Sequence, residues 1–252
     1  MAVVLLEKPR PGVAVIRLNR PEARNALTTE VRRLIEGFVN EISEDESVRA
    51  VVLTGSDHVF AVGADLREQA GRDVAGAINT FTTHAIWRSP KPVIAAVNGD
   101  AFGGGCELVL QCDFAIASKI ARFAQPEVNV GFVPGGGATQ RLPRVIGRQN
   151  AMYALLTGTP IPAGDAFRMG LVSEVVEGDA LDRALELATQ IASRPPITVR
   201  QIKELVRLGL DAPAEVGLAM ERRGWQLMFG TKDLHEGINS ILENRTPIVR
   251  GE

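Results

Sequence analysis

The chain has 252 residues, of which 45% are hydrophobic, enough for one large α/β domain or for a core with a small appended lobe. Lysine and arginine total 28 against 30 aspartate and glutamate, and the longest basic clusters are pairs, so no nucleic-acid-binding patch is expected. Glu7, Lys8 and Pro9 directly follow the apolar run at residues 3–6, and no longer apolar run occurs that would span a membrane. We therefore expect a cytoplasmic protein without membrane association.

Short β-branched runs that end in polar or glycine turns predict buried strands. Thr28 or Thr29 is placed to cap an amphipathic helix whose apolar positions run from Val31 to Ile42 in steps of three and four. A second helix is expected at residues 78–87, ahead of a proline-containing break. Strands and helices thus alternate, which indicates an α/β fold. The expected strands lie at residues 13–18, 50–53, 93–97 and 114–117.

The last quarter of the chain has a different character. After an expected strand at 172–176, helices are predicted at residues 180–192, 197–208, 213–228 and 234–242. Their apolar content exceeds what a peripheral arm can hide, so they should pack on their own core or on another subunit, and we favour oligomerisation. We expect an active-site core over residues 1–195 and a helical lobe over residues 196–252.

Two glutamates in apolar or small-residue surroundings are the first candidates for a site. Glu107 follows a triple glycine and precedes Leu108, and a charge is costly to bury there without partners or a chemical use. Glu127 follows Pro126, and a glutamate directly after a proline is by itself typical of a solvated residue at the start of a helix. The pairing with Glu107 gives it weight as a second catalytic group.

The triple glycine at residues 103–105 has two interpretations. Neither it nor residues 135–137 complete a phosphate-binding or dinucleotide-binding motif, and the glycines can simply permit a tight turn. Alternatively, a helix that begins near Gly105 directs free N–H groups at an anion or a developing oxyanion, with Gly104 as the natural donor.

The remaining reactive side chains support no other chemistry. The three histidines show neither a metal-ligand spacing nor a nucleophile motif, so no metal and no serine hydrolase triad is expected. Cys106 and Cys112 are expected to be reduced residues of the core rather than a disulfide.

Several motifs in order resemble those of the enoyl-CoA hydratase (crotonase) family, and the resemblance covers nearly the whole chain. Val62, where alanine is more usual, and the order of small residues at Gly136 and Ala138 depart from the family pattern. The matching segments are residues 18–21 and 25–27, 60–66, 92–99 with 103–108, Cys112-Asp113, 123–127, 134–137 with 139–142, and 170–172.

The resemblance implies a spiral of ββα units followed by a C-terminal helical oligomerisation lobe, assembled as a homotrimer or homohexamer. It implies an acyl-CoA thioester substrate, with coenzyme A as part of the substrate and no separate cofactor. It places the oxyanion hole at the backbone N–H groups of Ala64 and Gly104; only Gly104 also follows from the residues themselves. The substrate-binding positions that it implies are Ala61, Asp65, Leu66, Arg67 and Gly135.

Within this family the glutamates decide the reaction. Hydratases are similar to this sequence in having glutamate at both positions, whereas isomerases commonly keep only the second. By this analogy Glu107 activates the water that adds at C3 of a 2-trans-enoyl-CoA and Glu127 delivers the proton to C2. An enoyl-CoA hydratase is therefore the leading expectation. An isomerase or other acyl-CoA enzyme is the alternative, and a non-enzymatic acyl-CoA-binding protein is disfavoured because it needs no such pair.

Overall fold

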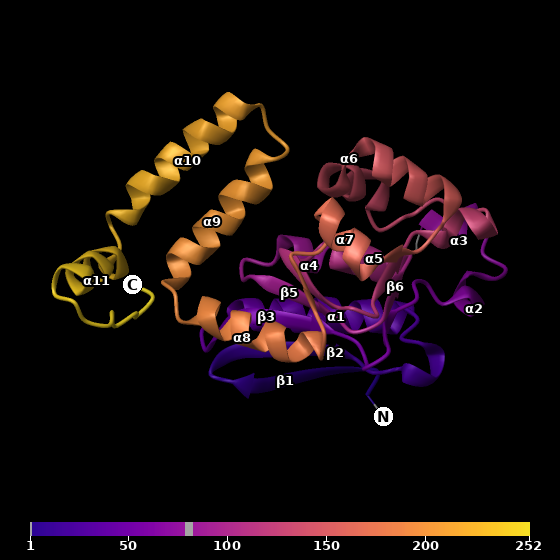
Figure 1. The fold of residues 1–252 in the computed structure, drawn as a ribbon, viewed down its shortest axis with the longest axis horizontal. Coiled ribbons are helices and arrows are strands. Elements are labelled where there is room, and N and C mark those ends of the chain that lie inside the picture. Colours follow the sequence, from indigo (N-terminus) through magenta and orange to yellow (C-terminus); the bar gives the residue numbers. More distant parts are fainter. Residues whose placement is uncertain (1, 79–82) are drawn as a thin grey trace.

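The computed structural model describes residues 2–78 and 83–252. Strands and helices alternate up to residue 192, and only helices follow (Figure 1). The strands are β1 (Val4–Arg10), β2 (Gly12–Leu18), β3 (Val48–Thr54), β4 (Val59–Ala61), β5 (Val93–Val97), β6 (Asp100–Phe102), β7 (Phe114–Ser118), β8 (Arg122–Ala124), β9 (Ile161–Pro162) and β10 (Glu174–Val176). The helices are α1 (Thr29–Glu44), α2 (Leu66–Gln69), α3 (Val74–Ile78), α4 (Ala85–Arg88), α5 (Gly104–Val109), α6 (Ala138–Thr157), α7 (Ala163–Met169), α8 (Ala180–Ala192), α9 (Pro196–Gly209), α10 (Ala214–Met228) and α11 (Lys232–Leu242), with 3₁₀ turns at Pro21–Ala23 and Pro126–Val130.

The strands form two sheets that the chain visits in turn. One sheet has the order β1-β2-β3-β5-β7-β10 and the other the order β4-β6-β8-β9. The pairs β3/β4, β5/β6 and β7/β8 each place one strand in either sheet, and β3-β5-β7 and β4-β6-β8 are parallel. Successive turns therefore stack as a spiral of ββα units, as expected from the resemblance.

Helices cover both faces of the larger sheet. Val13, Val15, Val52 and Ile94 pack with the alanine-rich face of α8, while the alternate residues of the same strands pack with the apolar face of α1. The strands are consequently buried on both sides, which explains why they read as short continuous apolar runs rather than as alternating patterns.

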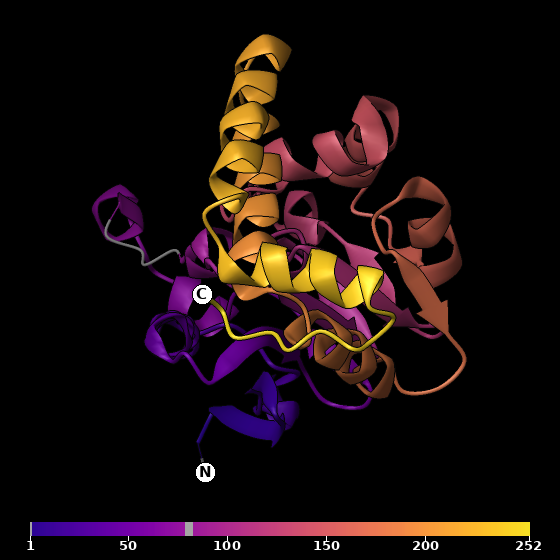
Figure 2. The same cartoon turned by 90° about the vertical axis from the view of Figure 1, so that its left-hand side faces the viewer.

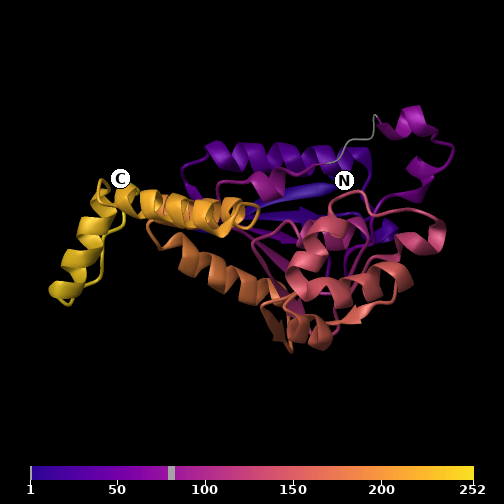
Figure 3. The same ribbon diagram turned by 90° about the horizontal axis from the view of Figure 1, so that it is seen from above.

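The last three helices project beyond this core. Helices α9 and α10 lie antiparallel and α11 crosses their far end, away from the sheets (Figures 2 and 3). None of their residues belongs to the two core clusters of the described chain. Their large apolar side chains are instead exposed, for example Leu218 at 63%, Leu227 at 66% and Ile241 at 76%. The boundary predicted at 195/196 stays a prediction.

The expected strands and the four C-terminal helices occur within a few residues of their predicted bounds. The continuous helix expected at residues 78–87 is wrong, since Thr83 and His84 are not helical and α4 begins only at Ala85. The Ala85 N–H donates to the Thr83 hydroxyl oxygen at 3.1 Å, a local hydrogen bond that competes with helical pairing at this point. Residues 79–82 of that prediction lie outside the described residues. Cys106 lies on α5 and Cys112 just beyond it, both buried and free. The described helices include none long and apolar enough to cross a membrane.

Candidate active site

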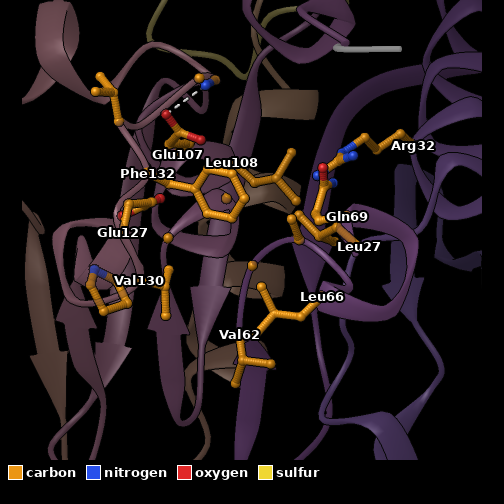
Figure 4. Close-up of a pocket in the computed structure, with 18 of the residues that line it drawn as sticks. Leu27, Arg32, Val62, Leu66, Gln69, Glu107, Leu108, Glu127, Val130 and Phe132 are labelled. Atoms are coloured by element: carbon orange, nitrogen blue, oxygen red, sulfur yellow. Dashed lines mark hydrogen bonds between the residues drawn. The ribbon is translucent and has the colours of Figure 1, made fainter. Parts of the chain in front are cut away.

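The predicted site residues follow the ends of three neighbouring parallel strands. Ala64 follows β4, Gly104 and Glu107 follow β6, and Glu127 follows β8. Since these strands are adjacent and parallel, their carboxyl ends meet at one edge of the small sheet. All four residues line one pocket of about 610 Å³ (Figure 4).

Glu107 lies on α5, buried to 6% exposure. Its Oε1 accepts hydrogen bonds from the backbone N–H groups of Gly136 at 2.7 Å and Ala138 at 3.1 Å. Burial raises the pKa of Glu107, while these two donors and the charges of Arg32 and Arg141 oppose the rise. The two hydrogen bonds to Oε1 therefore hold the carboxylate in one orientation.

Glu127 is the second residue of the 3₁₀ turn Pro126–Val130 and is half-buried. Gln125, with its amide nitrogen turned toward this carboxylate, donates to both oxygens at 3.2 Å. Burial, with a further contribution from the charge of Glu107, raises the pKa of Glu127 to about 7. A carboxyl group with this pKa exchanges a proton readily at neutral pH.

The turns that contain Ala64 and Gly104 lie against each other. A Cβ placed on Gly63 would lie 3.2 Å from the Gly104 nitrogen, and one placed on Gly104 would lie 3.8 Å from the Ala64 nitrogen. Gly63 and Gly103 both have positive φ, at 95° and 50°. Glycine permits both the backbone conformation and the close approach. Within the described chain, the N–H groups of Ala64 and Gly104 donate to no protein acceptor, so two donors are available beside the pocket.

A buried asparagine anchors the first loop to this turn. Asn25 has φ 54° and donates to the carbonyl oxygens of Val59 at 3.2 Å and Phe60 at 3.0 Å. Two residues on, the Leu27 N–H donates to the Gly63 carbonyl oxygen at 2.8 Å. The loop at residues 25–27 therefore supports the backbone that presents Ala64.

Arg141 anchors the glycine segment that holds Glu107. Its Nη1 donates to the Gly136 carbonyl oxygen at 2.9 Å, and its guanidinium lies 4.9 Å from the centroid of the Trp87 ring. Gly137, with φ 112°, leaves room for this side chain, since a Cβ there would lie 2.0 Å from Nη1. Arg141, which lies near the start of α6, therefore holds in place the glycine segment whose N–H groups donate to Glu107.

The five predicted substrate-binding residues separate into two groups. Leu66 and Gly135 line the pocket, whereas Ala61, Asp65 and Arg67 do not. Ala61 is fully buried beside Gly105, and Asp65 caps α2 through the Arg67 N–H at 3.1 Å. Contact of these three residues with a substrate stays a prediction.

Part of the lining was missed from the sequence. Gln111 could have been found, since it lies four residues after Glu107 in the turn that follows α5, but Arg32 and Gln69 carry no motif that marks them. The lining residues not predicted include Leu27, Arg32, Gln69, Thr83, Leu108, Gln111, Asn129, Val130, Phe132 and Val133.

A fold of stacked ββα units with two carboxylates and two free N–H groups at one pocket defines a crotonase-type protein. The family model described as enoyl-CoA hydratase/isomerase matches residues 8–251. The chain belongs to this family.

Relatives and solved structures agree with this placement. The chain is 41% identical to a 2,3-dehydroadipyl-CoA hydratase of Escherichia coli, covering 98% of each chain. It is 38% identical to a short-chain-enoyl-CoA hydratase of Clostridium acetobutylicum, covering 96% of this chain and 95% of the relative. The crystal structure of an enoyl-CoA hydratase from Bacillus anthracis superposes with a TM-score of 0.93 at 37% identity, covering 100% of both chains.

Proposed function

We propose that this chain is an enoyl-CoA hydratase, a carbon–oxygen lyase that adds water across a 2-trans-enoyl-CoA to give a 3-hydroxyacyl-CoA. The observation that carries the proposal is the presence of two carboxylates, Glu107 and Glu127, at one pocket. Both have raised pKa values, and the two are held by different donors. Two such carboxyl groups with distinct environments suit an acid and a base acting on one water.

In the proposed reaction Glu107 takes a proton from the water as its oxygen bonds to C3. The electron pair of the C2–C3 double bond then passes to C2 and the thioester carbonyl, which forms an enolate. Glu127, protonated near neutral pH, delivers its proton to C2. Glu107 ends protonated and Glu127 ionised, and proton exchange with solvent restores the starting states. The net change is the addition of one water.

The enolate oxygen is proposed to bind the N–H groups of Ala64 and Gly104. Support comes from the proximity of these two nitrogens and from their lack of a protein acceptor. Donors that are fixed before the reaction stabilise the developing charge without reorganisation, which is the usual basis of an oxyanion hole.

The family also contains isomerases, and a different net reaction is the alternative. The loss of the enoyl-thioester absorbance of trans-2-enoyl-CoA substrates, measured alongside the conversion of a 3-enoyl-CoA, separates the two. We expect hydration to dominate. Rapid movement of the double bond with negligible hydration would contradict the proposal.

We also propose that the chain assembles as a homotrimer or homohexamer through its C-terminal helices. The exposed apolar side chains on α10 and α11 support this, because monomeric proteins rarely expose so many large apolar groups in one region. Light scattering at micromolar concentration tests it, and a mass equal to one chain would contradict it. We also propose a role in fatty acid or related acyl-CoA metabolism. The cytoplasmic location and the absence of a cofactor beyond the CoA of the substrate stay predictions.

A further inference from the structure

Arg32 is a charged side chain in the pocket lining that the proposed reaction does not use. It lies early on α1, and Figure 4 shows it beside Gln69, across the pocket from Glu107 and Glu127. Its guanidinium forms no hydrogen bond or salt bridge in the described part of the chain. Burial lowers its pKa, which means that the cation is partly removed from water without a protein partner.

The two acidic side chains whose charges act on Arg32 are already engaged by other donors. Glu68 accepts hydrogen bonds from the Thr29 N–H at 3.0 Å and from the Thr29 hydroxyl at 3.1 Å, and it lies 3.7 Å from Arg72. Glu107 accepts two backbone N–H groups. Their charges favour the protonated form of Arg32, but neither of them ion-pairs with it. The five donors of the guanidinium therefore remain available to a ligand.

Other polar groups line the same pocket. Gln111 is 3% exposed, and its Oε1 is buried without a hydrogen-bond partner. Gln69 accepts from Arg72 at 3.4 Å through Oε1, and its amide nitrogen donates to no acceptor within the described residues. Buried polar groups in proteins are normally paired. A purely hydrocarbon acyl tail would leave these groups and Arg32 unpaired.

We propose that Arg32 selects acyl-CoA substrates whose acyl chain ends in a carboxylate, which the guanidinium and the Gln69 amide bind on the side of the pocket opposite Glu107 and Glu127 (Figure 4). The planar guanidinium matches a carboxylate with two parallel hydrogen bonds, and a partly desolvated pair of this kind is strong. This inference rests on the proposed function, because it names the substrate class of the same site. It assigns Arg32 a role in binding and none in the chemical step.

Measuring ligand binding in the absence of turnover tests the proposed role of Arg32 directly. Isothermal titration calorimetry compares hexanoyl-CoA with its analogue of equal carbon number that ends in a carboxylate. We expect the Arg32→Leu change to lower the affinity for the carboxylated ligand by roughly 10- to 100-fold, the usual effect of losing hydrogen bonds to a charged group. Hexanoyl-CoA should bind within about threefold of wild type or more tightly. Arg32→Gln serves as a second variant if Arg32→Leu folds poorly.

Arg33→Gln is the matched control, since it removes the same charge from an exposed neighbour on α1 that does not line the pocket. It should leave the preference for the carboxylated ligand unchanged. If Arg32→Leu lowers the affinities for both ligands and for free CoA equally, Arg32 binds the CoA phosphates and the proposal is overturned. An unchanged preference in both Arg32 variants would overturn it as well.

The two proposals fail separately. Hydration of the uncharged trans-2-hexenoyl-CoA tests the reaction alone, because that substrate carries no terminal carboxylate. If the protein hydrates this substrate but its preference for carboxylated ligands does not depend on Arg32, the proposed hydratase activity stands and the proposed carboxylate site is wrong. If the preference depends on Arg32 but no hydration occurs, the carboxylate site stands and the proposed hydratase activity is wrong. Carboxylated substrates of four, five and six carbons then identify the chain length that reaches Arg32.

Discussion

Gly136 and Glu107 depend on each other. The Gly136 N–H donates to Glu107 Oε1 at 2.7 Å, and the missing side chain of Gly136 leaves the space occupied by the second oxygen. A Cβ at position 136 would lie 2.4 Å from Oε2, well inside van der Waals contact. The glycine segment therefore both orients the carboxylate and makes room for it.

A Gly136→Ala change should displace the Glu107 carboxylate while leaving the core intact. Misplacement of a reacting group by about 1 Å costs on the order of 10²-fold in rate, so we expect a loss of kcat of that size. Steady-state hydration kinetics and circular dichroism provide the measurement. Gly37→Ala is the control, because a Cβ at Gly37 on α1 meets no atom within 4 Å. Wild-type turnover in Gly136→Ala would argue against a catalytic Glu107.

Replacing each glutamate by glutamine should lower hydration by roughly 10²–10⁴-fold, since the amide keeps the shape but exchanges no proton. The glutamine Oε1 at position 107 can still accept from Gly136 and Ala138, so folding should survive. The double variant should lose little more than the worse single variant, because groups that act as a unit are non-additive.

The same variants distinguish the hydratase from an isomerase. In an isomerase, Glu107→Gln would spare movement of the double bond and Glu127→Gln would abolish it. Near wild-type hydration by Glu107→Gln would contradict the role of Glu107 as the base that activates water.

The pH dependence of kcat/KM should reveal Glu127 as the proton donor. Its pKa is raised to about 7, so the fraction that holds a proton falls as pH rises through 7. Hydration that needs this proton should therefore decline above pH 7, approaching about tenfold per pH unit. The decline should be absent from the residual activity of Glu127→Gln. A rate that rises through pH 7 would instead indicate that Glu127 acts as a base.

A Gly104→Pro change should remove one proposed oxyanion donor with limited damage to the helix. Gly104 is the first residue of α5, the position where proline is best tolerated. We expect turnover to fall by ~10²–10³-fold, the scale for one oxyanion-hole donor. Thermal unfolding of the variant controls for folding damage. A folded variant with undiminished turnover would contradict the role of the Gly104 N–H.

The strands of the larger sheet other than β1, together with the C-terminal helices, were predictable because their signals are local. Strands such as β5 are buried on both faces and read as continuous apolar runs, and α8 repeats its apolar residues at helical spacing. The strands of the smaller sheet escaped prediction because β6 and β8 span three residues each, too few for a pattern. Helix α6 also escaped, since Pro143 and the non-helical Gly147 interrupt its periodicity.

By itself, the sequence determined the family, the two glutamates and the glycine turn, because the motifs that carry them are contiguous and occur in a recognisable order. Only the tertiary structure decided how these groups meet. Ala64, Gly104 and Glu127 share a pocket because β4, β6 and β8 are adjacent and parallel, which no local spacing reveals. The same holds for Arg32, which lines the pocket together with Gln69 because Thr29, at the start of α1, donates hydrogen bonds to Glu68 on α2. Arg32 has no acidic partner within the described residues because Glu68 and Glu107 accept hydrogen bonds from other donors, and only the folded chain shows those hydrogen bonds.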